Sequence, residues 1–297
     1  MDDSLNKIKP INIISKKLIL KIFLVFIVFV YFFLSAPFSS KDIIIHVSNG
    51  ESVASITSEL KTENTIRNEF SLKLFIKLLK RGTGIVSGDY LIKKNSPVWV
   101  IAWQIGRGVH GISPIRVTIR EGLTNIQIAD LMASKLSGFR RDLFLEETNS
   151  KQGYLFPDTY FFFPLDTTDE IIEKLSNNFD RKINGLNLND KKLSDIIIMA
   201  SILEGEASGK DDIGIISGIL WKRIALDMPL QVDVDKSTYN IKGLPLKPLN
   251  NPGLSSIMAA LNPISSPYLY YIHDKNGNVH YSKSFEEHKR NISNYLK

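Results

Sequence analysis

The sequence has no cysteine, and this absence removes several kinds of chemistry. Without thiols the chain forms no disulfide, carries no catalytic thiolate and builds no thiolate zinc site. It also lacks an H-E-x-x-H zinc motif and a G-x-S-x-G nucleophile elbow. We therefore expect a functional site that needs neither a metal ion nor a cofactor.

Net charge is also low for the length, at +6 over 297 residues. The lysines are spread along the chain, so we do not expect a nucleic acid as a partner. A mild preference for anionic surfaces, including membranes, is the better interpretation of this charge. The apolar fraction of 43% argues against wholesale disorder, and the length allows more than one domain.

A long apolar run near the N-terminus is the strongest single signal. Residues 22–34 form an unbroken run, and the whole segment extends from Leu18 to Phe38 if Lys21 reaches toward the headgroups. This length is close to the ~20 residues with which a helix spans a bilayer. Lysines gather before and at its start, which favours a cytoplasmic N-terminus.

The sequence therefore predicts a cytoplasmic tail over residues 1–16 and a transmembrane anchor over residues 17–38. The protein would lie in the cell (inner) membrane as a single-pass protein, with everything after the anchor outside the cytoplasm. The alternative is a cleaved signal peptide. Pro37 follows Ala36, and the small-x-small cleavage pattern is missing, so we favour the uncleaved anchor.

Two segments of the exported part resemble each other. "IIIHVSNGESVASI" begins at Ile43 and "IRVTIREGLTNIQI" begins at Ile115. Each has a β-branched run, then a glycine, then an amphipathic stretch, which predicts a strand, a turn and a helix. The repeat is short enough to have arisen by chance, but it suggests two related small α+β units.

Other segments have clear local signals. We predict a hairpin around Asn276-Gly277 and a helix with Ser194 as its N-cap. The further predicted elements are strands at 87–95 and 228–240, helices at 98–108, 211–224 and 254–263, an amphipathic helix followed by a loop over 167–190, and a basic C-terminal helix.

The segment "QGYLFPDTYFFFP", residues 152–164, is dense in aromatic residues. One interpretation is a core strand beside a turn. The other is a sugar-binding cleft, in which aromatic rings would stack on pyranose faces and Asp158 and Tyr160 would contact substrate. The sequence alone leaves both open.

A succession of short motifs now resembles a known family. "GYLFPDTY", "MASILEGEA", "MPLQVD", "GLP", "NNPG", "AALNP", "YLYYI" and "EEH" occur along the chain. Together they resemble the endolytic murein transglycosylases of the MltG/YceG-like family, from about Ile43 to the C-terminus. The chain departs from the family pattern at Gln152, at Val232 and in a shortened stretch between Asp233 and Gly243.

The resemblance implies a fold and an activity. The fold would be α+β, with a LysM-like α+β unit at 43–110, then a second α+β unit and a mixed α/β catalytic domain over 111–297. The activity would be that of a bacterial lyase that cleaves the MurNAc-GlcNAc bond of nascent peptidoglycan strands and leaves 1,6-anhydro-MurNAc ends. Such an enzyme would end glycan polymerisation beside peptidoglycan synthases.

The resemblance also places the catalytic residue on Glu206, the second glutamate of the family's E-x-E motif. Helical residues turn by ~100° each, so Glu204 and Glu206 lie on roughly opposite faces of one helix. Glu206 continues the apolar face of Ile202 and Leu203, where an apolar setting would favour the protonated carboxyl near neutral pH. Glu204 follows small residues, which suits a hydrogen bond to a neighbouring loop or to substrate.

Gln231 and Asp233 alternate along a predicted strand and would face the same side. We interpret them as cleft residues that bind sugar groups or orient Glu206, although a solvated strand face remains open. A rival function is a membrane-tethered peptidoglycan-binding scaffold without turnover. Hydrolysis of the muramidase type is a rival reaction.

Overall fold

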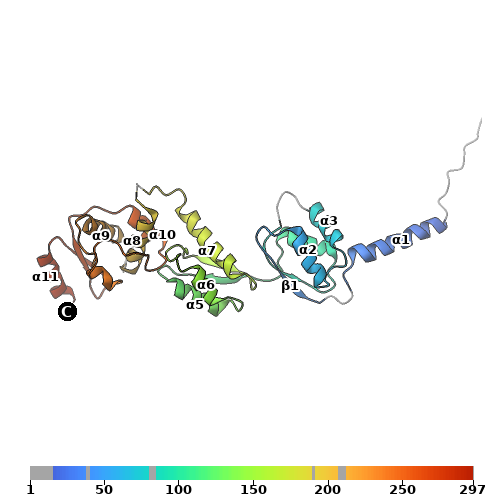
Figure 1. Cartoon of the computed structure of the whole chain (residues 1–297), viewed down its shortest axis with the longest axis horizontal. Coiled ribbons are helices and arrows are strands. Elements are labelled where there is room, and N and C mark those ends of the chain that lie inside the picture. Colours follow the sequence, from blue (N-terminus) through green and yellow to red (C-terminus); the bar gives the residue numbers. More distant parts are fainter. Residues whose placement is uncertain (1–15, 38–40, 80–84, 189–190, 207–211, 297) are drawn as a thin grey trace, which may run out of the picture. The chain divides into compact units, whose positions relative to one another are not determined.

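The computed structural model describes residues 16–37, 41–79, 85–188, 191–206 and 212–296, without the side chains of residues 32–34. The chain forms two compact units, Met1–Ser113 and Pro114–Lys297, which we call the N-terminal and C-terminal units (Figure 1). The predicted cytoplasmic tail lies almost wholly outside the described residues, as does Phe38 at the end of the predicted anchor.

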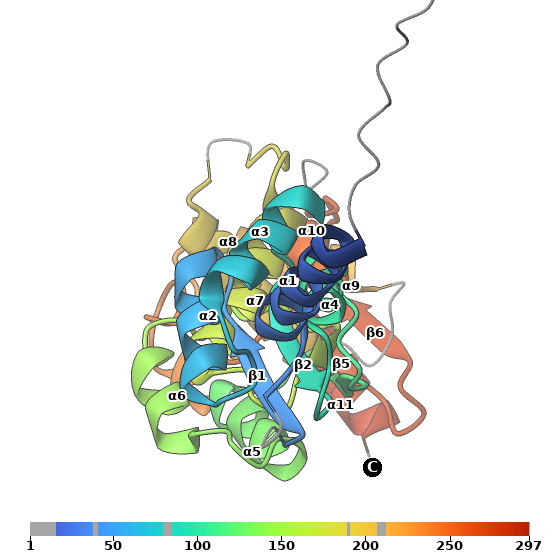
Figure 2. The same ribbon diagram turned by 90° about the vertical axis from the view of Figure 1, so that its right-hand side faces the viewer.

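The N-terminal unit packs helices against a two-stranded antiparallel sheet. Ile45 on one strand lies opposite Tyr90 on the other, and both are buried in the unit's own core. α2 and α3 lie side by side in the unit (Figure 2). The elements are α1 (Lys16–Leu34), β1 (Ile43–Val47), α2 (Val53–Thr62), α3 (Glu69–Leu79), β2 (Gly88–Ile92) and α4 (Val98–Arg107).

α1 exposes apolar side chains along most of its described length, and residues 22–29 are each about half exposed. Its C-terminal part is tied to the unit, because the Arg67 guanidinium lies 4.4 Å from the centre of the Tyr31 ring. Among the residues that the structure describes, no helix combines the length and the apolar character needed to cross a membrane.

The C-terminal unit begins with a second antiparallel strand pair that has its own core. Val117 lies opposite Tyr160, and the core includes Ile128, Phe144 and Phe162. The elements of this part are β3 (Ile115–Thr118), α5 (Asn125–Lys135), α6 (Arg141–Glu147), β4 (Thr159–Phe162) and α7 (Thr168–Ile183).

The rest of the C-terminal unit is built around α8. The adjoining helices α9 and α10 pack against α8, and a hairpin and α11 complete this part. Every described strand pair in the chain is antiparallel, so the class is α+β throughout, and the predicted mixed α/β part is better called α+β. The elements are α8 (Leu193–Glu206), α9 (Ile213–Ala225), the 3₁₀ turn η1 (Lys236–Tyr239), α10 (Leu254–Leu261), β5 (Tyr270–His273), β6 (Val279–Ser282) and α11 (Phe285–Tyr295).

The two similar segments fold alike, as the sequence predicted. β1 and β3 are each followed by a glycine with positive φ, +76° at Gly50 and +79° at Gly122. A hydroxyl then caps the next helix, from Ser52 before α2 and from Thr124 before α5. The left-handed backbone at each glycine turns the chain from strand into helix, which explains why glycine recurs there.

Other predicted elements are confirmed as well. α4 ends at Gly108, whose φ of +67° forms a left-handed C-cap. The predicted hairpin is β5–β6, and the Asp274 carboxylate accepts backbone N–H bonds from Asn276 and Asn278 across its turn.

Two local predictions are wrong. Ser194 is not an N-cap, because α8 already begins at Leu193 and the Ser194 hydroxyl donates to Asp195 within the first turn. Residues 228–240 do not form a strand, and η1 lies within this segment. Gln231 has a φ of +51°, which breaks the extended backbone, and only an isolated bridge joins Pro229 to Lys242.

Candidate active site

α8 carries Glu206 at its C-terminal end. The helix is buried from Ile196 to Leu203, whereas Glu206 is only half-buried. At Gly205 an added Cβ would lie 2.6 Å from Cγ1 of Val234. The glycine therefore allows the backbone of the following loop to come close to the glutamate.

Three donors hold the Glu206 carboxylate. Oε1 accepts from the backbone N–H groups of Asp233 (N···O 2.8 Å) and Val234 (3.3 Å). Oε2 accepts from the hydroxyl of Tyr271 (O···O 3.1 Å). The sequence predicted an apolar setting, but the loop folds back over the helix end and surrounds the carboxylate with polar groups.

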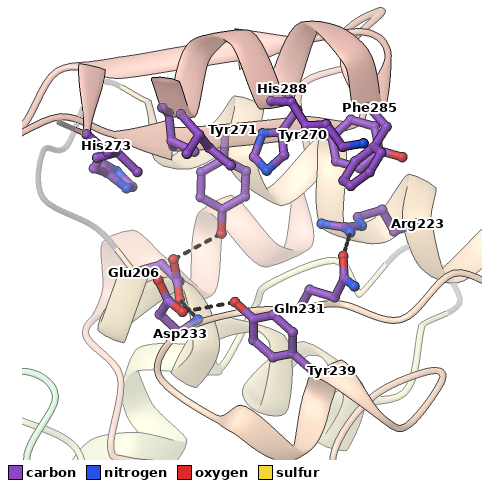
Figure 3. A pocket seen from close by; sticks show the side chains of 14 residues that line it. Glu206, Arg223, Gln231, Asp233, Tyr239, Tyr270, Tyr271, His273, Phe285 and His288 are labelled. Atoms are coloured by element: carbon purple, nitrogen blue, oxygen red, sulfur yellow. Dashed lines mark hydrogen bonds between the residues drawn. The ribbon is translucent and has the colours of Figure 1, made fainter. Parts of the chain in front are cut away.

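Tyr271 reaches Glu206 from the β5–β6 hairpin (Figure 3). Burial, followed by the nearby charge of Glu206 and the hydrogen bond to it, raises the pKa of Tyr271 well above its usual value. The phenol therefore keeps its proton at neutral pH and acts as a hydrogen-bond donor to the carboxylate.

A pocket of about 480 Å³ opens beside this carboxylate. Its walls come from α8, α9, the loop before η1, η1 itself, the hairpin and α11. The lining residues are Glu206, Arg223, Gln231, Asp233, Tyr239, Tyr270, Tyr271, Ile272, His273, Phe285, His288, Lys289, Ile292 and Leu296. No set of three converging histidine or carboxylate ligands for a metal occurs among these lining residues, all of which the structure describes.

A buried cation lies on the far side of the pocket from Glu206 (Figure 3). Arg223 of α9 is only 4% exposed, and its Nη2 donates to Oε1 of Gln231 at 2.6 Å. The guanidinium also lies over the ring of Tyr270, 5.2 Å from its centre. The left-handed backbone of Gln231 turns its side chain toward this arginine, so the pair links α9 to the loop that donates to Glu206.

Asp233 is paired at the edge of the pocket. Its carboxylate accepts from Lys236 and, at 3.0 Å, from the Tyr239 hydroxyl. These hydrogen bonds lower the pKa of Asp233, the bond from Lys236 being the largest cause. Asp233 is therefore an ionised group near neutral pH and is unsuited to donate a proton.

Comparison with known proteins identifies the family. A model of the YceG-like family matches residues 45–235 and 237–294, which together make up most of the chain. The chain belongs to the YceG-like family.

Several named proteins and one crystal structure are similar to this chain. A Bacillus subtilis protein named endolytic murein transglycosylase is 26% identical over 311 residues, which cover 87% of this chain and 86% of that protein. A Streptococcus pneumoniae protein of the same name is 22% identical, with 87% of this chain and 59% of that protein covered. The structure resembles that of a YceG-like protein from Listeria monocytogenes, with a TM-score of 0.53, 25% identity, and 85% and 99% of the two chains covered.

Glu204 points to a different part of the fold than Glu206. Its Oε2 accepts from the backbone N–H of Gly253 at 2.9 Å and from the Ser256 hydroxyl at 2.7 Å. Both donors lie at the N-terminus of α10, where the helix dipole favours a negative charge. The predicted hydrogen bond to a neighbouring loop is thus present, and Glu204 is not among the pocket-lining residues.

Asp158 and Tyr160 are placed together but apart from the pocket lining. Tyr160 is buried on β4, where its hydroxyl donates to the Phe156 carbonyl at 2.6 Å. Asn178 of α7 donates to both the Tyr160 hydroxyl (2.9 Å) and the Asp158 carboxylate (3.2 Å). Burial raises the pKa of Tyr160 to about 12. These contacts join β4 to α7, which agrees with the core-strand interpretation of the segment.

The sequence reasoning missed Tyr271 and Tyr239. The motif "YLYYI" suggests packing within the hairpin, and Tyr268 does pack there, since its ring stacks on Tyr281. Tyr270 and Tyr271 both line the pocket, although simple alternation along a strand would place neighbouring residues on opposite sides. Only the tertiary position of the hairpin brings Tyr271 to Glu206.

Proposed function

We propose that this chain is an endolytic peptidoglycan lytic transglycosylase in which Glu206 acts first as general acid and then as general base. The observation that carries the proposal is the unequal environment of the two Glu206 oxygens at the wall of an open pocket. The names of the Bacillus and Streptococcus relatives support the same activity.

The hydrogen bonds suggest which oxygen handles the proton. Oε1 already accepts two backbone N–H bonds, and a protonated oxygen there would meet donors instead of acceptors. Among the residues that the structure describes, Oε2 accepts one hydrogen bond, from the Tyr271 hydroxyl, which can rotate and exchange donor for acceptor. Oε2 is therefore the oxygen that gives a proton to substrate and takes one back.

The reaction then needs one carboxyl group and no water. Glu206 protonates the glycosidic oxygen, and the bond from that oxygen to C1 of MurNAc breaks. The hydroxyl on C6 of the same sugar attacks C1, forms the 1,6-anhydro ring and returns its proton to the Glu206 carboxylate. Because the nucleophile belongs to the sugar that is being cleaved, the attack is intramolecular and needs no positioned water.

A hydrolase would use two carboxyl groups. Asp233 is the other carboxylate on the pocket wall, but it is ionised and paired with Lys236 and Tyr239. We assign Asp233 and Gln231 to binding sugar groups and to holding the loop whose backbone donates to Glu206. Asp158, Tyr160 and Glu204 support the fold around this site, by way of α7 and α10.

We propose that residues 17–38 attach the chain to the cell membrane, with the N-terminus in the cytoplasm and the catalytic part outside. The exposed apolar side chains of α1 and the lysines before it support this attachment. Residues 43–110 would form a LysM-like unit, and their strand–helix–helix–strand–helix order supports a compact glycan-binding module. In this position the enzyme would cut strands as synthases extend them.

Digestion of uncrosslinked glycan strands, followed by mass spectrometry, tests the proposal. The wild-type chain should release products that lack one water relative to hydrolytic products. Glu206→Gln should keep the fold and lose these products by a factor of ~10²–10⁴.

Glu204→Gln is the matched control, because it removes a charge two residues away that faces α10. It should lower the free energy of unfolding by about 1 kcal/mol and leave per-molecule activity largely intact. Fully hydrated products would identify a muramidase. Glycan binding without any product would identify a scaffold.

A further inference from the structure

α3 of the N-terminal unit is apolar on more than the face that it buries. Leu72 and Ile76 are buried in the core of the unit. Phe70, Leu74 and Leu78 follow one another at four-residue spacing, which places them along one side of the helix. They are 63%, 42% and 69% exposed. A helix that is apolar on both its buried and its exposed side normally meets a second apolar environment.

Two tryptophans of α4 add to this exposed surface. Trp99 and Trp103 lie one helical turn apart and are 44% and 46% exposed. With Phe75, Leu79 and Val100 they line a pocket of about 470 Å³ between α3 and α4. We call the exposed residues Phe70, Leu74, Leu78, Trp99 and Trp103 the apolar face.

Basic residues accompany the apolar face. Lys73 and Lys77 lie on α3 among its apolar residues. Lys73 pairs with Glu69 in the first turn of α3, with Nζ 2.8 Å from Oε2. From Phe70 to Gly88 the sequence has four basic residues and no acidic one, and Arg107 ends α4. Tryptophan, leucine and phenylalanine beside lysines are typical of surfaces that lie in the headgroup region of a membrane.

The apolar face is continuous with the helix that we assign to the membrane. α1 contacts α4, the helix that carries both tryptophans. Its end is fixed there by Arg67, which lies over the Tyr31 ring and donates from Nε to the Ser35 hydroxyl at 3.3 Å. The apolar helix α1 therefore meets the rest of the N-terminal unit at α4, the helix that carries Trp99 and Trp103.

We propose that the apolar face is a membrane-docking surface, which holds the N-terminal unit on the lipid headgroups where α1 enters the bilayer. Trp99 and Trp103 lie at the interface, Phe70, Leu74 and Leu78 reach the acyl boundary, and Lys77 contacts anionic headgroups. This inference rests on the proposed membrane attachment of residues 17–38, and it is separate from the chemistry of Glu206.

A glycan strand fits this pocket less well than lipid does. Sugars are bound by aromatic rings together with side chains that hydrogen-bond to hydroxyl groups. The five lining residues are aliphatic or aromatic, and the indole N–H is the only polar side-chain group among them. Lipid binding requires no such hydrogen bonds.

Tryptophan fluorescence tests the docking, because the chain has only three tryptophans. The third, Trp221, lies in the C-terminal unit, where its Nε1 donates to the Ala260 carbonyl. The full-length chain is reconstituted into vesicles of phosphatidylglycerol and phosphatidylcholine, with or without lipids brominated on the upper acyl chain. Trp221→Phe leaves the two docking tryptophans as reporters, and Trp99→Phe with Trp103→Phe leaves Trp221 as the internal control.

Brominated lipid should quench the Trp221→Phe protein and leave the Trp221-only protein unquenched. Phe70→Ser with Leu74→Ser and Leu78→Ser should abolish that quenching without a loss of cooperative melting. Lys77→Gln should weaken the quenching most in vesicles rich in phosphatidylglycerol.

Flotation of the vesicles distinguishes the possible failures. A chain that does not float with the vesicles overturns the membrane attachment and the docking together. A chain that floats, with Trp99 and Trp103 open to aqueous acrylamide and unquenched by brominated lipid, overturns the docking alone. Protection from both quenchers also overturns it, and shows that the C-terminal unit or a second copy covers the face. If soluble glycan strands change the fluorescence of Trp99 and Trp103 and brominated lipid does not, the pocket binds sugar and the docking is overturned.

Discussion

The two carboxylate oxygens of Glu206 have different hydrogen-bond donors, so they are not equivalent toward a substrate. Oε1 is held by the backbone of a loop that Gly205 allows to come close. Oε2 accepts a hydrogen bond from the Tyr271 hydroxyl, on a hairpin 65 residues further along the chain. A carboxyl group fixed on one side presents the same oxygen to every substrate, which is the preorganisation that acid–base catalysis requires.

The Tyr271 hydroxyl is the contact that can be removed with the least disturbance. In Tyr271→Phe we expect kcat to fall about tenfold, because one hydrogen bond to a charged group is worth roughly 1.5–3 kcal/mol and part of it is lost when substrate binds. KM should change little, since the ring remains in the pocket wall. Kinetics on soluble glycan strands and a thermal melt measure both effects.

Tyr268→Phe is the matched control for this residue. Tyr268 lies in the same tyrosine-rich segment, stacks on Tyr281 and is not among the residues that line the pocket. Its variant should have wild-type kcat. Equal losses in both variants, or a lowered melting temperature that accounts for the lost activity of Tyr271→Phe, would show that the tyrosine serves only the hairpin.

At the level of elements, Gly205 near the end of α8 lowers the stability of the helix but leaves room for the loop that contacts Glu206. Alanine is about 1 kcal/mol better than glycine inside a helix. In Gly205→Ala, however, the new Cβ would meet Val234 at 2.6 Å and push the loop away from Glu206. We therefore expect a chain that is as stable as the wild type or more so, yet at least several-fold less active.

Val234→Ala separates these effects, because it shortens the side chain that the new methyl group would meet. The double variant Gly205→Ala with Val234→Ala should recover much of the lost activity, whereas Val234→Ala alone should have only a small effect. If the double variant is as inactive as Gly205→Ala, crowding of the loop is not the cause of the loss.

The β5–β6 hairpin should respond to acid. Hydrogen bonds from Asn278 and His280, and from the backbone at the turn, hold the pKa of Asp274 below its usual value. Its contribution to stability is therefore complete above about pH 4, the ordinary range of a free aspartate, and is lost as the pH falls further. The difference in melting temperature between the wild type and Asp274→Asn should shrink as the pH is lowered from about 6 to 3. A difference that stays constant contradicts this role.

Local signals predicted many elements because those elements depend on nearby residues. The turns at Gly50 and Gly122 and the C-cap at Gly108 each need a left-handed residue, and the hairpin needs Asn276-Gly277. Residues 228–240 alternate in polarity as a strand would, yet they form a loop and the 3₁₀ turn η1. Their conformation depends on contacts with distant groups, and the Arg223 side chain that Gln231 binds is one of these. Pattern within a segment does not reveal such contacts.

The sequence predicted some of the residues that line the candidate site but missed two tyrosines. The resemblance places the catalytic residue on Glu206, and Gln231 and Asp233 were predicted from alternation along a strand that does not form, yet all three line one pocket. Tyr271 and Tyr239 could not be found, because the hairpin and η1 reach the pocket only through the packing of the whole unit. The shortened stretch after Asp233 does not open a gap, since η1 and Tyr239 lie there.

In the whole molecule, the proposed functional surfaces fall in separate units, as the hydrophobic cores do. One core contains buried residues from Ile43 to Ile105 and lies wholly in the N-terminal unit. The other two contain residues from Val117 onward. Both the Glu206 pocket and the network at Asp158 lie in the C-terminal unit, whereas the apolar face belongs to the N-terminal unit.

Residues 43–110 should therefore be dispensable for the fold of the catalytic part. We expect a chain of residues 114–297 to melt cooperatively and to release the same products from soluble glycan strands in a Glu206-dependent manner. Its rate on membrane-associated strands should fall, because the proposed attachment and docking are gone. Differential scanning calorimetry and product analysis measure these outcomes, and Leu203→Ala in the shortened chain should cost about 2–5 kcal/mol if its core is packed as in the full chain. A broad melt that Leu203→Ala leaves unchanged would mean that the C-terminal unit needs the N-terminal unit in order to fold.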